Sequence, residues 1–386
     1  MTLTEFILEH ADDDTSRLIL ARDRWPDIDM DKAATIIECR KRLRTKLPEW
    51  YAVPDIIYPD RLSSEQSSST STASYKAHLA ERILRSGKAA EASKGRIADL
   101  TGGLGADSLA FSRIASRVLY NEMDAERAAA ARHNFPLLGA RNIDVISYRV
   151  EPESAGPHDF WDELRSFRPD IVYMDPARRS ATGNKVFLPE DCSPDVLTLI
   201  PGIFSIVPVM LLKLSPMADI SMLLKRLHGA ATVELHVVAS GGECKELLLW
   251  CVPYRGRAID TRLIVSENGK SIATPSAAEG NTVPRFLQDP DRLSSMRYLF
   301  EPGKALAKAG LFNAIGSMFV SKDNVNDAAS MEDVMLKAGR STHIYFSGKK
   351  PAGDAADFGK IFRIVSIIPL NKQGIKDFGA RYPEAE

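Results

Sequence analysis

The chain has 386 residues and a nearly balanced charge, with 50 Lys and Arg side chains against 51 Asp and Glu. This length predicts two or three domains, and the balance argues against a polycation that coats nucleic acid or membranes. No Cys-x-x-Cys pair and no ligand-like spacing of histidines is present, so we expect no metal site. Without a run of about 18 to 20 apolar residues or a basic and apolar leader, we expect a cytoplasmic protein that does not span a membrane.

Residues 1–90 are predicted to form a helical region. Residues 1 to about 48 have helical periodicity and many charges, and we interpret basic side chains such as Arg40, Arg42 and Arg44 as a solvated face rather than a phosphate site. Ser and Thr dominate residues 63–72. This composition by itself predicts a flexible linker.

A glycine-rich turn occupies residues 99–107, which read Asp-Leu-Thr-Gly-Gly-Leu-Gly-Ala-Asp. It follows a short strand signal at Ile97 and precedes a predicted helix over 108–114. Gly102 and Gly103 are expected to adopt positive φ angles, and a residue without Cβ lets backbone N–H groups approach a ligand closely. The turn alone is equally consistent with an ordinary strand-to-helix connection.

An acidic residue follows the next predicted strand, which covers residues 118–120. Glu122 lies where the carboxylate at the end of the second strand of a βαβ unit accepts hydrogen bonds from ribose hydroxyls. Met123 would offer an apolar contact to an adenine ring. Each residue has an ordinary structural explanation when taken singly, but together with the glycine turn they indicate a nucleotide site.

A third strand signal, over residues 169–174, ends in Asp-Pro-Ala-Arg-Arg. The pair Asp175 and Pro176 places a carboxylate and a rigid backbone carbonyl at the mouth of a ligand crevice. Nicotinamide enzymes have no use for this feature there, whereas a methyl-transferring enzyme must hold its acceptor in line with the sulfonium methyl. The next basic pair, Arg178 and Arg179, is equally consistent with a phosphate contact and with a solvent-facing surface.

Apolar runs alternate with helical segments as far as about residue 250. The runs cover residues 118–120, 145–147, 171–174, 209–214, 233–239 and 247–251. This alternation predicts an α/β fold with a doubly wound, mostly parallel sheet, and the turn at 240–243 predicts an antiparallel edge. Beyond residue 252 we expect one or two small α+β modules, with Phe362 to Ile368 as an apolar central strand in their core.

The three motifs resemble those of class I S-adenosylmethionine-dependent methyltransferases. Residues 99–105 are similar to the first motif of that family, Glu122 to its ribose-binding acid, and residues 175–178 to its fourth motif beside the acceptor. Residues 65–76 and 299–310 are similar to flanking segments of bacterial, Bacteroidetes-type methyltransferases that carry a C-terminal THUMP-like domain.

The resemblance implies a Rossmann-like sheet over 91–255, a small α+β linker module over 256–317, with a ferredoxin-like fold as one option, and a THUMP-like domain over 318–386. It also implies S-adenosylmethionine as cofactor and RNA as substrate. Under the same resemblance, the Ser- and Thr-rich segment is interpreted as a loop of the family that becomes ordered over the cofactor or the acceptor, instead of a flexible linker. The residues that it implies are Asp99, Thr101, Gly102, Gly103, Gly105, Glu122 and Met123 for the cofactor, Asp175 and Pro176 for the acceptor, and Arg178, Arg179, Lys213, Tyr75 and Lys76 for the substrate.

The sequence departs from this family at two places. The position of an adenine-binding acid falls at or near Arg149, which leaves the adenine contact unassigned. The fourth motif also lacks the second proline and the aromatic residue of Asp-Pro-Pro-Tyr, which weakens the case for a nucleobase amine as acceptor.

Other functions stay open. An RNA-binding protein that retains the fold without turnover is one, and a nicotinamide-dependent oxidoreductase is another, although it leaves Asp175 and Pro176 unexplained. A pyrimidine carbon-5 mechanism with a covalent cysteine is disfavoured, because residues 211–216 contain no thiol and the acidic neighbours of Cys244 would raise its thiol pKa.

Overall fold

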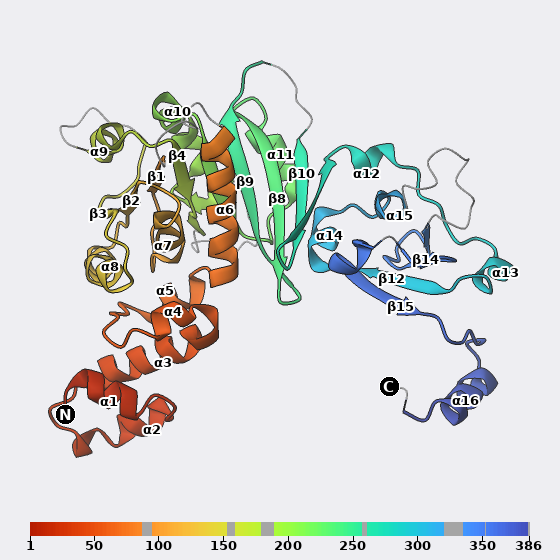
Figure 1. Cartoon of the computed structure of the whole chain (residues 1–386), viewed down its shortest axis with the longest axis horizontal. Coiled ribbons are helices and arrows are strands. Elements are labelled where there is room, and N and C mark those ends of the chain that lie inside the picture. The colour runs from red at the N-terminus through yellow and green to blue at the C-terminus, as the bar shows by residue number, and fades with distance from the viewer. Residues whose placement is uncertain are drawn as a thin grey trace. The chain divides into compact units, whose positions relative to one another are not determined.

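The computed structural model describes residues 1–86, 95–152, 159–178, 189–256, 261–319, 335–351 and 353–384 (Figure 1). The chain divides into two units, which comprise residues 1–240 with 245–261 and residues 241–244 with 262–386. The N-terminal helical region and the predicted sheet domain therefore share the first unit.

The N-terminal region is helical, as the periodicity predicts. Its helices are α1 (Leu3–Glu9), α2 (Thr15–Leu20), η1 (Arg22–Arg24), α3 (Met30–Lys46), α4 (Pro48–Tyr51), α5 (Arg61–Gln66) and α6 (Thr70–Ser86). Side chains that accept hydrogen bonds from the first-turn N–H groups begin several of them, including Thr2, Asp14 and Asp29. Such caps satisfy backbone donors that have no partner within the helix.

The Ser- and Thr-rich segment is not a flexible linker, so the expectation from composition is wrong. Asp60 caps α5 by accepting from the Ser63 N–H at 2.7 Å. Ser69 and Thr72 each accept from the other's backbone N–H, at 3.2 and 3.1 Å, at the start of α6. Ser64 is fully buried. Composition misled because the hydroxyls that favour solvated loops also cap helices when the chain supplies the matching N–H groups.

The sheet of the first unit has the strand order β8-β9-β7-β4-β1-β2-β3. Its strands are β1 (Arg96–Asp99), β2 (Arg117–Asn121), β3 (Ile143–Ile146), β4 (Ile171–Met174), β7 (Met210–Leu214), β8 (Ala231–Ser240) and β9 (Glu243–Pro253). The five neighbouring strands β7, β4, β1, β2 and β3 pair in parallel, and β9 pairs antiparallel with β7. The predicted α/β fold with an antiparallel edge is confirmed.

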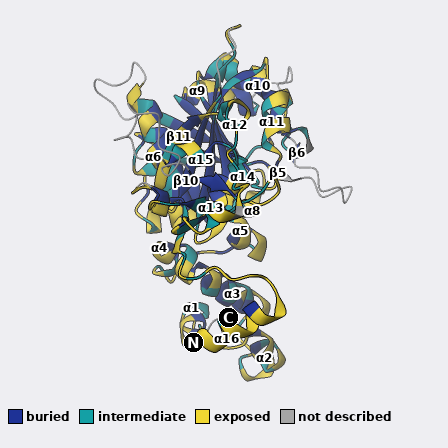
Figure 2. Cartoon of the chain, turned by 90° about the vertical axis from the view of Figure 1, so that its right-hand side faces the viewer, coloured by how far each residue is buried: buried dark blue, intermediate teal, exposed yellow. Residues whose placement is uncertain are grey.

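Helices connect the strands and cover the sheet. They are α7 (Ala106–Ser112), α8 (Ala125–Leu137), α9 (Phe160–Phe167), α10 (Val196–Ile206) and α11 (Ile220–Leu227), and the short strands β5 (Ala177–Arg178) and β6 (Cys192–Ser193) pair apart from the sheet, with η2 (Pro189–Asp191) just before β6. Helices α6 and α7 pack on one face through buried side chains such as Ala80, Phe111, Tyr173 and Leu211. Figure 2 shows the buried residues concentrated in the strands.

A second apolar cluster joins the N-terminal helices to the sheet domain. It includes Phe6 and Trp50 from the N-terminal region, Leu104 from the glycine turn, Tyr120 from β2 and Phe135 from α8. Apolar burial of this kind is the main favourable contribution to folding. The N-terminal region is therefore packed against the turn that the sequence identified as a nucleotide site.

The second unit contains a hairpin and a four-stranded antiparallel sheet of order β13-β14-β12-β15. Its elements are β10 (Arg262–Glu267), β11 (Lys270–Pro275), α12 (Ala278–Asn281), α13 (Pro290–Leu293), β12 (Tyr298–Pro302), α14 (Lys304–Ala309), α15 (Ile315–Met318), β13 (Leu336–Lys337), β14 (Tyr345–Ser347), η4 (Ala355–Asp357), β15 (Gly359–Arg363) and α16 (Lys372–Arg381). Because β12 pairs with β14 and β15, strands from both sides of the predicted boundary at residue 318 form one sheet.

The segment from Phe362 to Ile368 is not a central core strand. Strand β15 ends at Arg363 and lies at the edge of its sheet. Phe362, Val365 and Ile367 are 47%, 65% and 46% exposed. An apolar run of this length shows that a strand is possible but carries no information about its position in the sheet.

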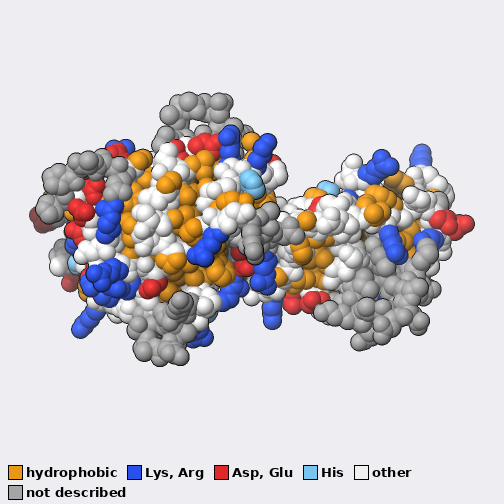
Figure 3. Space-filling model, turned by 90° about the horizontal axis from the view of Figure 1, so that it is seen from above, with side chains coloured by type: hydrophobic (Ala, Val, Ile, Leu, Met, Phe, Trp, Pro, Cys, Tyr) orange, Lys and Arg blue, Asp and Glu red, His pale blue; other side chains and the backbone are white. Residues whose placement is uncertain are grey.

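Three further findings concern membrane-spanning helices, surface charge and metal-binding clusters. In the described part of the chain, no helix is long and apolar enough to cross a membrane. Figure 3 views the molecule from above, and on the visible face the Lys and Arg side chains are scattered among acidic and apolar ones. No cluster of His, Cys, Asp or Glu side chains suited to a metal ion occurs among the described residues.

Candidate active site

The glycine turn after β1 requires glycine for two different reasons. Gly103 and Gly105 have φ angles of 55° and 97°, in the left-handed region. Gly102 does not have a positive φ, contrary to the prediction; a Cβ there would instead lie 2.1 Å from the ring of Tyr120. The same ring is fixed by its hydroxyl, which donates to the Gly103 carbonyl at 2.5 Å.

Glu122 closes this turn from the neighbouring strand. Its carboxylate accepts hydrogen bonds from the N–H of Gly103 at 2.9 Å and from the N–H of Asp124 at 3.0 Å. The residue is only 7% exposed, whereas the next side chain, Met123, is 63% exposed. The structure therefore brings together the predicted glycine turn and the predicted ribose-binding acid.

Asp99 lies beneath the turn rather than in the crevice. It is 1% exposed, and its carboxylate accepts from the Thr101 N–H at 3.1 Å and from the Ser108 hydroxyl at 2.6 Å. Burial raises the pKa of Asp99 to about 7, and the nearby Asp107 contributes in the same direction. In the structure the Asp99 side chain holds the turn, and its place near the cofactor stays a prediction.

The turn is also tied to the predicted acceptor motif. The hydroxyl of Thr101 accepts from the Asp175 N–H at 2.6 Å. The side chain of Asp175 is 33% exposed and forms an ion pair with Lys213 on β7. Pro176, which follows, is buried and fixes the backbone φ angle beside the carboxylate. Two predicted site residues, Asp175 and Lys213, are therefore in direct contact.

Lys213 is a strongly held cation. Its side chain is 15% exposed, and burial alone would lower its pKa. The carboxylates of Asp175, Glu246 and Asp107 outweigh that effect and raise the pKa of Lys213 well above its usual value. Lys213 is therefore expected to carry its positive charge at neutral pH.

Lys76 does not face a crevice, so the predicted substrate contact is wrong for this residue. It is 0% exposed. Its ammonium lies 2.9 Å from Glu246, 3.1 Å from Asp107 and 2.9 Å from the Ser68 hydroxyl. Lys76 neutralises two buried carboxylates and joins α6 to α7 and β9, and a substrate would have to displace these contacts to reach it.

Tyr75 also contacts the sheet. Its hydroxyl lies 2.7 Å from Nδ1 of His236 on β8, and Nε2 of His236 lies 3.0 Å from Glu234. His236 is 1% exposed. The structure places Tyr75 in the contact between α6 and the antiparallel edge, several strands away from the glycine turn.

Of the two arginines predicted to contact the substrate, Arg178 and Arg179, the structure describes only the backbone of the first. The backbone of Arg178 belongs to β5 and pairs with Cys192. Arg179 lies outside the described residues. Their role as substrate contacts stays a prediction.

The sequence reasoning missed Asn121, the residue before Glu122. Asn121 is buried, and its amide group donates to the carbonyls of Leu100 and Tyr148 at 3.1 and 3.0 Å and accepts from the Tyr148 N–H at 2.9 Å. It fixes the ends of β1 and β2 to the segment after β3. In the sequence, the only sign of this role is that Asn121 lies at the end of a predicted strand, directly before Glu122. Arg149, at or near the position at which the resemblance implies an adenine-binding acid, is exposed and pairs with Glu151 at 3.0 Å.

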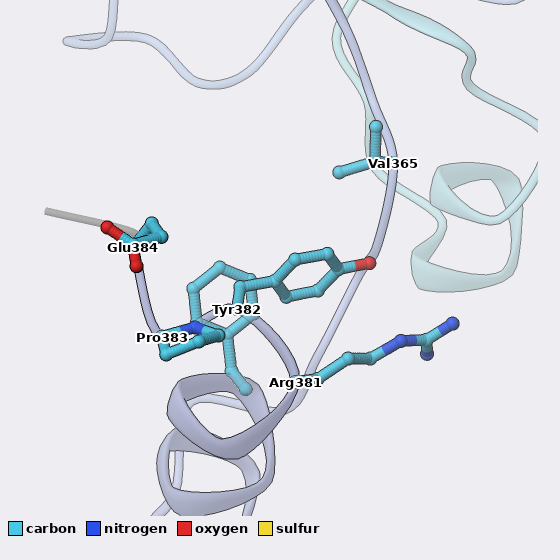
Figure 4. A pocket seen from close by; sticks show the side chains of 6 residues that line it. Val365, Arg381, Tyr382, Pro383 and Glu384 are labelled. Atoms are coloured by element: carbon cyan, nitrogen blue, oxygen red, sulfur yellow. The ribbon is translucent and has the colours of Figure 1, made fainter.

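A separate pocket lies beside α16 in the second unit (Figure 4). It is lined by Val365, Phe378, Arg381, Tyr382, Pro383 and Glu384. Its lining contains none of the residues predicted for a cofactor or an acceptor. The candidate active site is therefore the constellation at the ends of β1, β2, β4 and β7.

The parallel sheet, the glycine turn and the acid after β2 together define a Rossmann-like methyltransferase fold. A proposed methyltransferase from Porphyromonas gingivalis W83, whose structure is solved, is similar over 99% of this chain and 86% of its own, with 29% identity and a TM-score of 0.75. A 16S rRNA N2 G1207 methyltransferase from T. thermophilus, solved with AdoMet and guanosine, is similar over 46% of this chain and 43% of its own, with 16% identity and a TM-score of 0.31.

A SAM-dependent methyltransferase from Aquifex aeolicus is similar over 51% of this chain and 100% of its own, with 11% identity and a TM-score of 0.34. No protein-family model matches the sequence, and no curated protein matches it.

Proposed function

We propose that the protein is an S-adenosylmethionine-dependent methyltransferase that acts on RNA. The observation that carries the proposal is the order β7, β4, β1, β2 of four strands whose ends hold the site residues. Lys213 lies at the end of β7 and Asp175 follows β4. The glycine turn follows β1, and Glu122 follows β2. A turn suited to a nucleotide and an ion-paired carboxylate thus lie side by side at the carboxyl edge, where open α/β sheets bind ligands.

The residues present fit the cofactor. S-adenosylmethionine supplies an activated methyl group on a sulfonium centre. A Cβ on Gly103 would meet no atom within 4 Å, so the turn is open to a ligand on that side. Each Glu122 oxygen accepts one backbone hydrogen bond and retains a lone pair for a ribose hydroxyl, while Met123 offers exposed apolar surface to an adenine ring. Thr101 and Gly105 hold the shape of the turn around it.

Asp175 aligns the acceptor in this proposal. Lys213 holds its Oδ2 atom, and Thr101 holds its backbone N–H. With its carboxylate and its backbone both held in place, Asp175 accepts a hydrogen bond from an N–H of an amine acceptor. This hydrogen bond orients the nitrogen lone pair toward the methyl group. Alignment of this kind accounts for a large part of the rate enhancement when two reactants must meet in line.

RNA is proposed as the acceptor molecule on two grounds. Residues 65–76 and 299–310 resemble segments of methyltransferases with a THUMP-like domain, and residues 253–386 carry 19 Lys and Arg against 15 Asp and Glu. A modest excess of cations favours association with a polyanion. We extend the proposal to a THUMP-like domain that includes residues 318–386 together with strand β12, with which they share a sheet, and to Arg178 and Arg179 as substrate contacts.

Calorimetric titration with S-adenosylhomocysteine, S-adenosylmethionine and NAD tests the cofactor directly. We expect heat of binding for the first two and none for NAD. At a ligand concentration of about 100 times its Kd, binding should stabilise the folded protein by roughly 2.7 kcal/mol, which a thermal-shift assay detects. A response to NAD without a response to either sulfur ligand would show that the proposal is wrong.

A further inference from the structure

We propose that the second unit binds one nucleotide of single-stranded RNA, whose base stacks on the ring of His343 and whose phosphate is held by Lys337 and Arg340. The inference rests on the proposed function, since it gives the RNA a contact that the transfer reaction itself does not require. It concerns residues that belong neither to the predicted site nor to the candidate active site.

The first observation is a pair of stacked aromatic rings at the surface of the second unit. The ring centroids of Phe312 and His343 are 3.6 Å apart, and the ring planes are 15° from parallel. Phe312 is half-buried in the segment between α14 and α15, whereas His343 is exposed in the segment between β13 and β14. Phe312 covers one face of the His343 ring, and His343 is exposed on the remaining side.

Phe312 is held in a fixed position by its own backbone and that of its neighbours. Its carbonyl accepts from the hydroxyl of Tyr345 at 2.6 Å, and Tyr345 is 1% exposed. The next two N–H groups, of Asn313 and Ala314, donate to the Glu279 carboxylate at 2.7 and 3.1 Å, which partly compensates its negative charge. An anchored ring pair offers a flat surface, and every nucleobase has a face that can stack on such a surface.

The second observation is a buried lysine beside the ring pair. Lys337 is 5% exposed, and its ammonium lies 5.8 Å from the centroid of the Phe312 ring. The ammonium donates to the Arg340 carbonyl at 3.3 Å, and no carboxylate among the described residues forms an ion pair with it. An ammonium has three N–H donors, and a buried charge without an ionic partner is costly. A phosphate group would satisfy further donors and compensate the charge.

The two observations together point to a nucleotide rather than to a simple anion. The ammonium of Lys337 and the ring of His343 both lie against the Phe312 ring, so a single nucleotide spans them. Arg340, whose side chain is exposed, adds a second cation in the segment that joins Lys337 to His343. A free phosphate would leave the exposed ring unused. A paired base has no open face for stacking, so the site favours unpaired RNA.

The test is the affinity of the full chain for a fluorescein-labelled 12-nucleotide single-stranded RNA, measured by anisotropy at several NaCl concentrations. His343→Ala should weaken binding at least about fivefold, whereas His343→Phe keeps a stacking surface and should keep most of the affinity. Lys337→Met should weaken binding by about tenfold and reduce the slope of log Kd against log salt by about 0.7. His78→Ala, at an exposed histidine of α6 in the first unit, is the matched control and should change neither quantity.

A second readout separates stacking from phosphate binding. The fluorescence of 2-aminopurine placed in the same RNA is quenched when this base stacks on an aromatic ring. At saturating protein, we expect quenching by the wild-type protein and by Lys337→Met, and its loss in His343→Ala. Because His343 is exposed, its variants stay informative even where Lys337→Met perturbs the fold, which thermal melting reveals.

Calorimetry with S-adenosylhomocysteine runs in parallel on the same variants and should give wild-type affinity. Wild-type RNA affinity and quenching in His343→Ala would overturn the inference and leave the proposed function intact. Displacement of the RNA by AMP at an equal concentration of nucleotides would assign the site to a free nucleotide and overturn the inference as well. Failure of the wild-type protein to bind the RNA would also overturn it, whereas failure to bind S-adenosylhomocysteine would refute the proposed function.

Discussion

Replacement of Lys76 by methionine should destabilise the first unit strongly. The ammonium of Lys76 is the cation shared by Glu246 and Asp107, whose side chains are 2% and 10% exposed. Removal of one partner from a buried ion pair leaves an uncompensated charge and typically costs about 3 to 5 kcal/mol. For a unit of this size, such a loss lowers the Tm on the order of 10 °C.

Urea unfolding followed by circular dichroism measures this loss at pH 7 and pH 5. Burial raises the pKa of Glu246 already in the wild-type protein, and Lys76 opposes this effect, so its removal raises that pKa further. A carboxyl group with a raised folded-state pKa binds more protons in the folded state, so its contribution to stability is lost as pH rises through that pKa. The deficit of the variant should therefore shrink at pH 5.

The double variant with Glu246→Gln supplies a further control, since removal of both charges should recover part of the stability. The matched control, Lys32→Met on an exposed position, should stay within about 0.5 kcal/mol of wild type. A Lys76→Met variant as stable as this control would refute the structural role and restore Lys76 as a candidate substrate contact.

Two shorter predictions concern the site. Gly102→Ala should lower the Tm, because its Cβ would overlap the Tyr120 ring at a cost of about 1 to 3 kcal/mol, and an unchanged melting curve would contradict the packing. Glu122→Ala should weaken S-adenosylhomocysteine binding at least about tenfold in calorimetry; wild-type affinity would exclude the ribose contact.

Residue patterns predicted the framework of the first unit because its strands are buried on both faces. The strand signal at 171–174, for example, coincides with β4, whose residues are all buried. A strand end followed by an acid, as at Glu122 and Asp175, also identified positions that the structure brings to one edge. Local sequence carries this information because strand length, burial and chain direction are local properties.

The failures have a common cause, which is the dependence of a residue's role on distant partners. Lys76 was assigned to the substrate because residues 65–76 resemble a segment of the family, and its partners Asp107 and Glu246 are 31 and 170 residues away. The hydroxyl of Ser68 joins Lys76 to Asp107, a contact between distant residues that composition cannot reveal. The edge position of Phe362 depends on how four short strands pair across more than 60 residues.

The most direct test of the central claim is the transfer of a labelled methyl group from S-adenosylmethionine to total RNA from a strain that lacks the protein. The account predicts label in RNA with the wild-type protein and loss of most of it with Asp175→Asn, whose S-adenosylhomocysteine affinity should stay within severalfold of wild type. A wild-type protein that binds the cofactor and RNA but transfers no label would establish an RNA-binding role without turnover. Label recovered only in protein would refute RNA as the substrate.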